Sequence, residues 1–171
     1  CIFIYICIQI QKNKNMRKFF VATMLIILSI ITPSCDEQAG KNSIEIGGTV
    51  HYITEAYYID YENHVDDYYE IGLLLYGMTT MTNNILLSFS MKSTTDGDFT
   101  DGEYKYSRRD KKMSFNNASW NILLGTPVEI TEGSVSVEHV SGEYKFTVNC
   151  VDQDGNSVVG EFVGALFKQE L

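Results

Sequence analysis

The sequence predicts an all-β protein: a single antiparallel β-barrel or strongly curled β-sandwich of about eight strands, preceded by a cleaved signal peptide. Apolar and polar residues alternate with a period of two through most of the chain after residue 44, which is typical of half-buried strands. Turn signals separate these runs at short intervals, the chain has two prolines, and no amphipathic helix stands out. Together these observations favour an antiparallel barrel or sandwich.

The first element is the apolar leader "MRKFFVATMLIILSIITPSC", which runs from Met16 to Cys35. Its uncharged stretch, Phe19–Ile31, would span roughly 20 Å as a helix, whereas the hydrocarbon core of a membrane is roughly 30 Å thick. A basic pair precedes the stretch, and the small residue Ser34 stands directly before Cys35. This order describes a secretory signal peptide over 16–34, and its length disfavours the alternative of a transmembrane helix.

The end of the leader, "ITPSC", resembles a bacterial lipobox, in which the cysteine sulfur receives a diacylglycerol and the signal peptide is cut just before it. Thr32 and Pro33 make it more similar to lipoproteins of the Bacteroidota than to the enterobacterial consensus. That group often carries acidic residues after the cysteine as a signal for surface export, and Asp36 and Glu37 stand there. The resemblance implies that Cys35 is the lipid attachment site of an outer-membrane protein, surface-exposed or, alternatively, facing the periplasm.

Four parts are expected along the chain. Met16 begins a complete signal by itself, so residues 1–15 are interpreted as an extension from a start site assigned too far upstream, with a genuine amino-terminal extension as the alternative. The expected parts are the extension (1–15), the lipoprotein signal peptide (16–34), the acylated cysteine with a polar tether (35–43) and the β domain (44–171).

The net charge limits the expected partners, and the cysteine content limits the expected disulfides. Cleavage would remove four basic residues and no acidic ones, which moves the net charge from −9 to −13. Such a charge repels phosphate backbones, so no nucleic acid is expected as a partner, and it leaves the lipid as the attachment to the membrane. Cys150 would remain as a single cysteine, which excludes an intramolecular disulfide. Its phase with Phe146 and Val148 predicts a buried thiol that packs as a small hydrophobe.

Eight segments carry the strand pattern. In the first of them, Val50 and Tyr52 are expected on the face opposite His51. The joints "VSG" and "DQDGN" near the end of the chain supply the residues that tight hairpin turns need. Gly160 and Gly164 predict a bend where the sheet curls over its core. The predicted strands are 49–59, 68–76, 84–91, 102–107, 113–124, 134–139, 143–151 and 157–167.

The last third of the chain resembles a known family. Residues 133–166 read "GSVSVEHVSGEYKFTVNCVDQDGNSVVGEFVGAL", which is similar to the closing three-stranded meander of small Bacteroidota lipoproteins with calycin-like or lipocalin-like β domains. The upstream order also fits: a tyrosine-rich first strand, an apolar strand, then "DGEYKYS" after a polar loop. The resemblance covers Ile44 to Phe167 and implies the fold and the envelope location. Most members have no assigned activity, so it implies no functional residues.

Three aspartates in the loop "STTDGDFTDGEY" are a candidate for binding calcium. Asp96, Asp98 and Asp101 lie within six residues, and a hard cation prefers several oxygen ligands at close range. Their spacing does not match an EF-hand. The favoured alternative is a solvated loop in which aspartates stabilise turns. No other metal and no cofactor is expected.

A tyrosine-rich, acidic segment, "EAYYIDYENHVDDYYE", is the candidate contact surface. We predict that Tyr57, Tyr61 and Tyr68, together with Trp120, contact a glycan or a protein partner. Aromatic faces stack on sugar rings, carboxylates accept hydrogen bonds from hydroxyls, and exposed aromatic clusters mark interaction sites. The alternative is that these tyrosines are ordinary strand residues with half-buried rings.

The sequence contains no enzyme signature. Its three histidines, His51, His64 and His139, are far apart, and it has no Gly-x-Ser-x-Gly elbow, P-loop or dinucleotide fingerprint. We therefore expect a non-catalytic, lipid-anchored envelope lipoprotein that binds a glycan or a protein at its surface. The alternatives are a lipocalin-like carrier of a small apolar ligand and, less favoured, a hydrolase with an unrecognised site. A wide apolar cavity would favour the carrier, and a filled interior with external tyrosines would favour the surface module.

Overall fold

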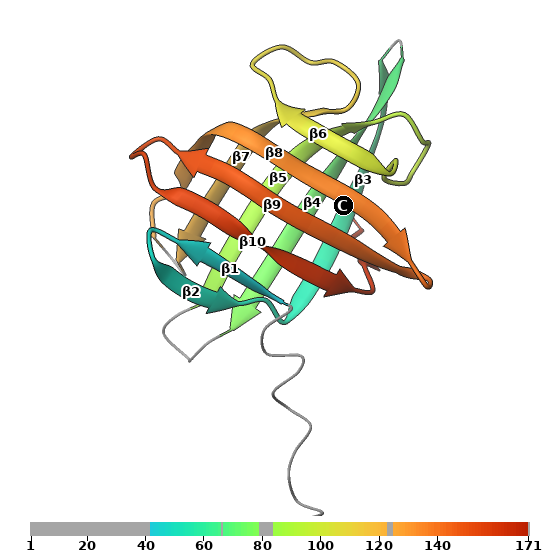
Figure 1. The fold of residues 1–171 in the computed structure, drawn as a ribbon. Coiled ribbons are helices and arrows are strands. Elements are labelled where there is room, and N and C mark those ends of the chain that lie inside the picture. The colour runs from blue at the N-terminus through green and yellow to red at the C-terminus, as the bar shows by residue number, and fades with distance from the viewer. Residues whose placement is uncertain (1–41, 66, 79–83, 123–124, 171) are drawn as a thin grey trace, which may run out of the picture. The chain divides into compact units, whose positions relative to one another are not determined.

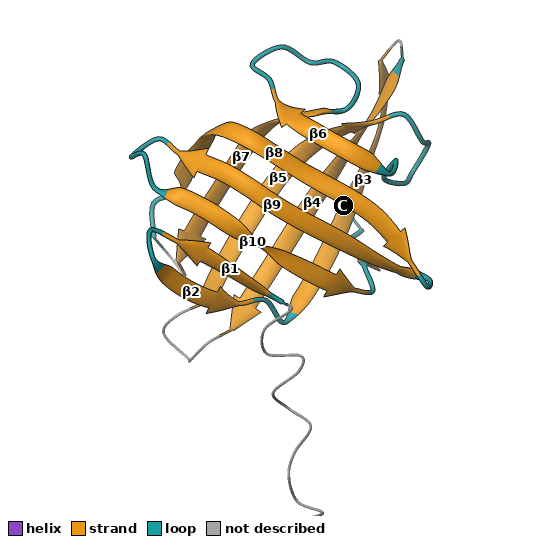
Figure 2. Cartoon of the chain, in the orientation of Figure 1, coloured by secondary structure: helices purple, strands orange, loops and turns teal. Residues whose placement is uncertain are grey.

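The computed structural model describes residues 42–65, 67–78, 84–122 and 125–170. The predicted signal peptide, the lipid-attachment residue Cys35 and most of the tether lie outside the described residues. Figure 2 shows strands, turns and loops, and no helix, in the part of the chain that is described. Accordingly, no helix within these ranges is long and apolar enough to cross a membrane.

The described residues form one sheet of eleven strands, which corrects the prediction of about eight. The additional strands are short: one precedes the predicted set, and the first and last predicted strands each divide in two. The strands are β1 (Ser43–Ile46), β2 (Thr49–Tyr52), β3 (Glu55–Val65), β4 (Tyr68–Met78), β5 (Asn84–Ser93), β6 (Gly102–Tyr106), β7 (Ser114–Ile122), β8 (Val128–Val140), β9 (Glu143–Asp152), β10 (Ser157–Gly164) and β11 (Phe167–Lys168).

The sheet curls strongly over itself, as a half-barrel, so that the layer containing β8, β9 and β10 crosses the layer containing β3, β4 and β5 (Figure 1). The strand order is β11-β3-β4-β5-β7-β6-β8-β9-β10-β1-β2. Neighbours pair antiparallel except for β11 with β3 and β6 with β7, which run parallel. The all-β class and the strong curl of a mainly antiparallel sheet confirm the predicted fold class.

Side chains from both layers fill the space between them. Leu73 of β4, Leu87 of β5 and Phe146 of β9 are fully buried. Phe89 and Phe115 pack edge to face, with their ring centroids 5.5 Å apart. Burial of each such side chain stabilises the fold by about 1.5–3 kcal/mol relative to exposure. The apolar alternation of the sequence therefore becomes the core of the curled sheet.

The first predicted strand breaks at residues 53 and 54, and its inward and outward faces exchange there. His51 is buried, whereas Val50 and Tyr52 are 48% and 45% exposed, although the alternation placed these two on the same side as the buried Ala56. The assignment of Val50 and Tyr52 was therefore wrong. Alternation holds only within one strand, and an odd number of residues in the connection moves every later side chain to the other face.

Both predicted hairpin turns are confirmed. Ser141 and Gly142 connect β8 to β9 with φ angles of 53° and 86°, and positive φ at both positions is the requirement of a type I′ turn. Gly155 has a φ of 82° in the turn between β9 and β10. There the Asp152 carboxylate accepts hydrogen bonds from the backbone nitrogens of Asp154 and Asn156, at 2.9 and 2.8 Å.

Candidate ligand-binding site

The four predicted aromatic contacts do not form one surface. Tyr57 and Tyr61 are on the outer face of β3, where Tyr61 is 42% exposed and the Tyr57 ring lies 5.8 Å from that of Phe167. Trp120 is half-buried against the core, and its Nε1 donates a hydrogen bond to Asp152 at 3.2 Å. The structure therefore places Tyr57 and Tyr61 on one face of β3 and Trp120 elsewhere.

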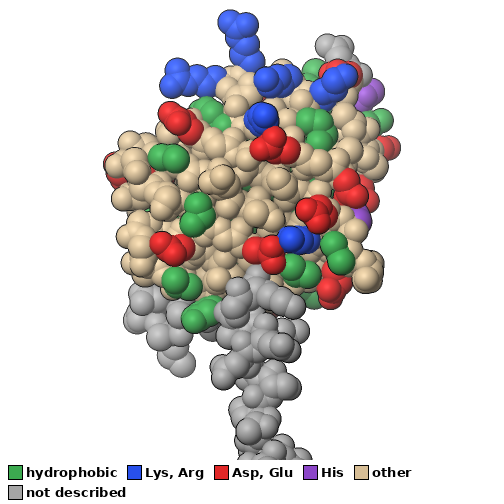
Figure 3. All heavy atoms as spheres, in the orientation of Figure 1, with side chains coloured by type: hydrophobic (Ala, Val, Ile, Leu, Met, Phe, Trp, Pro, Cys, Tyr) green, Lys and Arg blue, Asp and Glu red, His purple; other side chains and the backbone are tan. Residues whose placement is uncertain are grey.

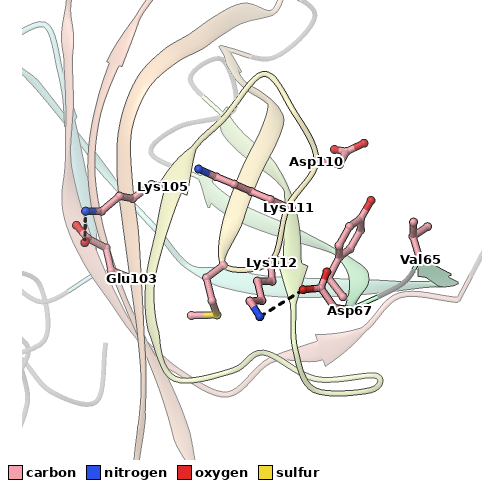
Figure 4. Close-up of a pocket in the computed structure, with 9 residues that line it drawn as sticks. Val65, Asp67, Glu103, Lys105, Asp110, Lys111 and Lys112 are labelled. Atoms are coloured by element: carbon pink, nitrogen blue, oxygen red, sulfur yellow. Dashed lines mark ion pairs between the residues drawn. The ribbon is translucent and has the colours of Figure 1, made fainter.

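Tyr68, the fourth predicted contact, belongs to a pocket of about 550 Å³ (Figure 4). The pocket lies where the tip of the β3–β4 hairpin approaches β6 and the loop between β6 and β7. Its lining combines apolar side chains, lysines and carboxylates. The apolar members are Val65, Tyr68 and Met113, the lysines are Lys105, Lys111 and Lys112, and the carboxylates are Asp67, Glu103 and Asp110.

Exposed ion pairs line the pocket. The Lys112 Nζ lies 3.3 Å from Asp67, and the Lys105 Nζ lies 3.3 Å from Glu103 (dashed in Figure 4). The pKa of Glu103 is lowered, mainly by a hydrogen bond from Ser134 and to a smaller extent by one from Lys105. This carboxylate is therefore ionised at neutral pH. Exposed pairs of this kind are weak, so their donors and acceptors can turn toward a polar ligand at little cost.

A buried lysine on β5 supports the pocket wall. Lys92 is 2% exposed, and its Nζ lies 2.7 Å from Glu70, 2.9 Å from Ser90 and 3.6 Å from Asp110. Burial by itself raises the pKa of Glu70, but the hydrogen bonds from Lys92 and Ser90 outweigh it and hold this pKa below its usual value. The Lys92 ammonium also lies over the Tyr68 ring, 5.9 Å from its centroid. A cation in this position is attracted to the negative face of the ring.

The loop between β6 and β7 is fixed by its own side chains. The Ser107 hydroxyl donates to the carbonyl of Arg109 at 2.7 Å, and the Ser114 hydroxyl donates to the carbonyl of Lys111 at 2.5 Å. Met113, which ends the loop, has a φ of 53°. These hydrogen bonds hold the backbone of the loop beside the pocket, and its charged side chains are exposed.

A second pocket, of about 470 Å³, adjoins the other side of this loop. It lies beside the point at which β8 changes partner: Glu129 pairs with Ser119 of β7, and the later Ser134 pairs with Lys105 of β6. Its lining is mostly polar. The members are Tyr106, Arg108, Asn116, Asn117, Ala118, Ser119, Pro127, Glu129 and Ile130.

The predicted calcium loop is fastened to β8 and β9 by two of its aspartates. Asp98 accepts a hydrogen bond from the Tyr144 hydroxyl at 2.5 Å, and Asp101 accepts one from the backbone nitrogen of His139 at 3.0 Å and also contacts its ring. Asp96 is exposed on the same loop. Within the described ranges, no group of three or more His, Cys, Asp or Glu side chains is arranged to hold a metal ion.

Cys150 is buried, as its phase in the strand predicts. Burial raises the pKa of its thiol to about 12. Backbone hydrogen bonds at Asn149 and Ser134 lower this pKa, but their effect is smaller than that of burial. A thiol with so high a pKa stays protonated at neutral pH and is a poor nucleophile. Its role in this structure is therefore packing.

The basic loop and the buried lysine were missed by the sequence reasoning. The loop was visible as "RRDKK", from Arg108 to Lys112, which is a concentrated basic run in an acidic chain and an informative charge pattern. Lys92 gave a weaker signal, as one charge at the end of the apolar strand "NILLSFSMK". Its pairing with Glu70 could not be read from the sequence, because it depends on the register between β4 and β5.

Fold and site together define a curled β-sheet domain with a mixed apolar and charged pocket on one side of a charged loop and a mostly polar pocket on the other. Comparisons of the chain with protein-family models, with curated proteins and with solved structures gave no match.

Proposed function

We propose that this protein is a lipid-anchored lipoprotein of the outer membrane, surface-exposed, whose β domain is a non-catalytic module that binds a glycan. The observation that carries the proposal is the mixed lining of the 550 Å³ pocket, in which apolar side chains stand next to lysines and carboxylates. Sugar rings present apolar C–H faces together with hydroxyl groups, and a pocket that binds them needs both an apolar surface and a few polar groups that fix orientation.

The packing of the interior supports this module over the lipocalin-like carrier. Leu73, Leu87, Val137 and Phe146 come from both layers of the curled sheet and are fully buried in one cluster. A carrier requires an internal cavity large enough for an apolar ligand. Both pockets described above lie instead at the surface, beside the β6–β7 loop.

The attachment to the membrane rests on Cys35 and its leader. The described fold supports a domain held by its amino-terminal end, because the Asn42 side chain bonds both to the nitrogen and to the carbonyl of Val163 on β10, at 2.8 and 3.0 Å. Asn42, which belongs to the predicted tether (35–43), is therefore already fastened to the sheet, one residue before β1 begins at Ser43.

Glycan binding is tested by thermal unfolding of the full-length protein in neutral detergent against a panel of oligosaccharides and polysaccharides. A ligand that binds only the native state stabilises it by about 2.7 kcal/mol at a concentration of 100 Kd, so the melting temperature should rise. Replacement of two exposed pocket residues by alanine, in the double variant Lys112→Ala with Glu103→Ala, should abolish this rise in melting temperature.

The control, Lys145→Ala with Glu161→Ala, also removes one cation and one anion; these two form a 3.1 Å ion pair on β9 and β10, outside both pockets. This control should keep the full glycan-induced rise. A panel without any active glycan, or a rise that the pocket variant retains, would contradict the proposal.

A further inference from the structure

The basic side chains are distributed unevenly over the domain. Within the described ranges, five of the eight Lys and Arg residues belong to β6 and the following loop. Figure 3 shows their side chains gathered over the β6–β7 loop at the top of the view, whereas Asp and Glu are spread over the rest of this face. The five are Lys105, Arg108, Arg109, Lys111 and Lys112. The chain is acidic, with a net charge of −9, yet most of the basic residues in the described ranges gather at this loop.

Three of these cations form no ion pair with any Asp or Glu side chain that the structure describes. The other Lys residues of the described ranges pair with carboxylates: Lys92, Lys105, Lys112, Lys145 and Lys168. Among the residues that the structure describes, no ion pair involves Arg108, Arg109 or Lys111, although the sequence contains 22 Asp and Glu residues. Neighbouring like charges repel one another, so an anion that lies between them would be bound favourably.

Two of these cations line the two pockets on either side of the loop. Lys111 lines the 550 Å³ pocket and Arg108 lines the 470 Å³ pocket. Asp110 belongs to the first pocket, and its carboxylate accepts a hydrogen bond at 2.5 Å from the amide of Asn116, which belongs to the second. The two pockets are therefore neighbours across the loop, and an extended ligand can occupy both.

The guanidinium groups define the chemistry of the acidic group. Arginine presents a planar set of donors that matches carboxylate, sulfate or phosphate in a bidentate manner. Tyr68 and Met113 in the first pocket and Tyr106 in the second supply apolar surface between the charges. The carboxylates of Asp67, Glu103 and Asp110 can accept hydrogen bonds from hydroxyl groups, which a sugar ring supplies beside its acidic group. A sugar chain with acidic groups on its rings therefore matches the cations, the carboxylates and the apolar side chains.

We propose that the protein binds an acidic polysaccharide, carboxylated or sulfated, laid across the β6–β7 loop, with Arg108, Arg109 and Lys111 contacting its acidic groups. This inference rests on the proposed glycan-binding function and adds the charge of the ligand and the residues that select it. An acidic polysaccharide is favoured over an anionic membrane, because the acid excess over the remaining surface repels an anionic bilayer.

The test measures the affinity of the full-length protein for polygalacturonate and for dextran sulfate, with fully methyl-esterified polygalacturonate and dextran as their neutral counterparts. Calorimetry at low ionic strength should give a Kd for at least one acidic polymer that is lower than that for its neutral counterpart by about tenfold or more. The two acidic polymers distinguish carboxylate from sulfate. Added salt should weaken this binding, because it screens exposed charges.

The variant Arg108→Gln with Arg109→Gln and Lys111→Gln should remove the preference for the acidic polymer and its salt dependence. The matched control, Lys145→Gln with Lys168→Gln, removes cations that are paired elsewhere on the domain and should leave the Kd unchanged. All five side chains can be replaced without opening the core, and the melting temperature of each variant checks that it is folded.

Equal affinity for acidic and neutral polymers, unchanged in the triple variant, would overturn this inference and leave the glycan-binding function standing. Failure of every polysaccharide to bind would overturn both. Binding to phosphatidylglycerol-containing vesicles by the Cys35→Ala protein, lost in the triple variant and without polysaccharide binding, would replace the polysaccharide with a membrane surface.

Discussion

At the scale of single residues, Lys92 is a charge inside a strand whose neighbours are almost all buried. Its partner Glu70 is the only described carboxylate within 3 Å of the ammonium group. Taking a charge out of water is unfavourable unless a partner compensates it, and the loss of one member of a buried pair leaves the other uncompensated. Lys92 also lies 3.6 Å from the carboxylate of Asp110, which lines the pocket.

We expect Glu70→Gln to lower the free energy of unfolding by roughly 3 kcal/mol, because it leaves the Lys92 charge without its nearest carboxylate. The control Glu161→Gln, which breaks the half-exposed pair with Lys145, should cost less than about 1 kcal/mol. Denaturant titration measures both values. Equal losses in the two variants would mean that burial does not set the strength of the Lys92 pair.

The same variant has an expected pH dependence. The pKa of Glu70 in the folded protein lies below its ordinary value of 4.5. Its contribution to stability is therefore present above that ordinary value and is lost as the pH falls through the lower, folded value. Below pH 4.5, unfolding free energy should fall more steeply in the original protein than in Glu70→Gln.

At the scale of elements, β1 and β10 approach closely because residue 160 is a glycine. A Cβ atom at Gly160 would lie 2.0 Å from the carbonyl oxygen of Ser43 and 2.7 Å from the Cα of Ile44. Both are atoms of the β1 backbone, which cannot move without breaking the pairing of the two strands. The glycine that the sequence assigned to a bend therefore serves a close contact between strands.

Gly160→Ala should destabilise the fold by roughly 2 kcal/mol, since overpacking forces the backbone of β1 away. Gly72→Ala on β4 is the matched control, because its nearest contact would be the Tyr61 hydroxyl at 3.0 Å, at the end of a side chain that can move. Unfolding free energies compare the two, and hydrogen exchange of the β1 amides locates the change. A larger effect at Gly72 would refute the close-contact explanation.

At the scale of the whole molecule, the domain is asymmetric in charge. Five of the eight Lys and Arg residues in the described ranges belong to β6 and the β6–β7 loop, while the chain as a whole is acidic. Such a distribution attracts anions to one region and repels them from the rest. An anchor at the amino-terminal end would keep the protein at the membrane without the help of a basic membrane-binding patch.

Replacement of the predicted lipid-attachment residue, Cys35→Ala, should move the protein from the detergent phase to the aqueous phase in a phase-partitioning experiment. The expected shift follows from the loss of the acyl chains, which supply the apolar surface for insertion. Cys150→Ser is the control: this thiol is buried within the sheet, so the variant should partition as the original protein does. Unchanged partitioning of Cys35→Ala would contradict the anchor.

The sequence by itself determined the all-β class, the strands from residue 84 to 91 and from 143 to 151, and the turns at Ser141–Gly142 and Gly155. These features depend on alternation and on backbone angles, which are properties of residues close together in the chain.

Only the tertiary structure decided the rest: the division of the first strand, which turned Val50 outward, and the sites made by Lys92 with Glu70 and by Tyr68 with Lys111. Strand register and the curl of the sheet bring these groups together. Both follow from the summed packing of many distant residues, which no local pattern records.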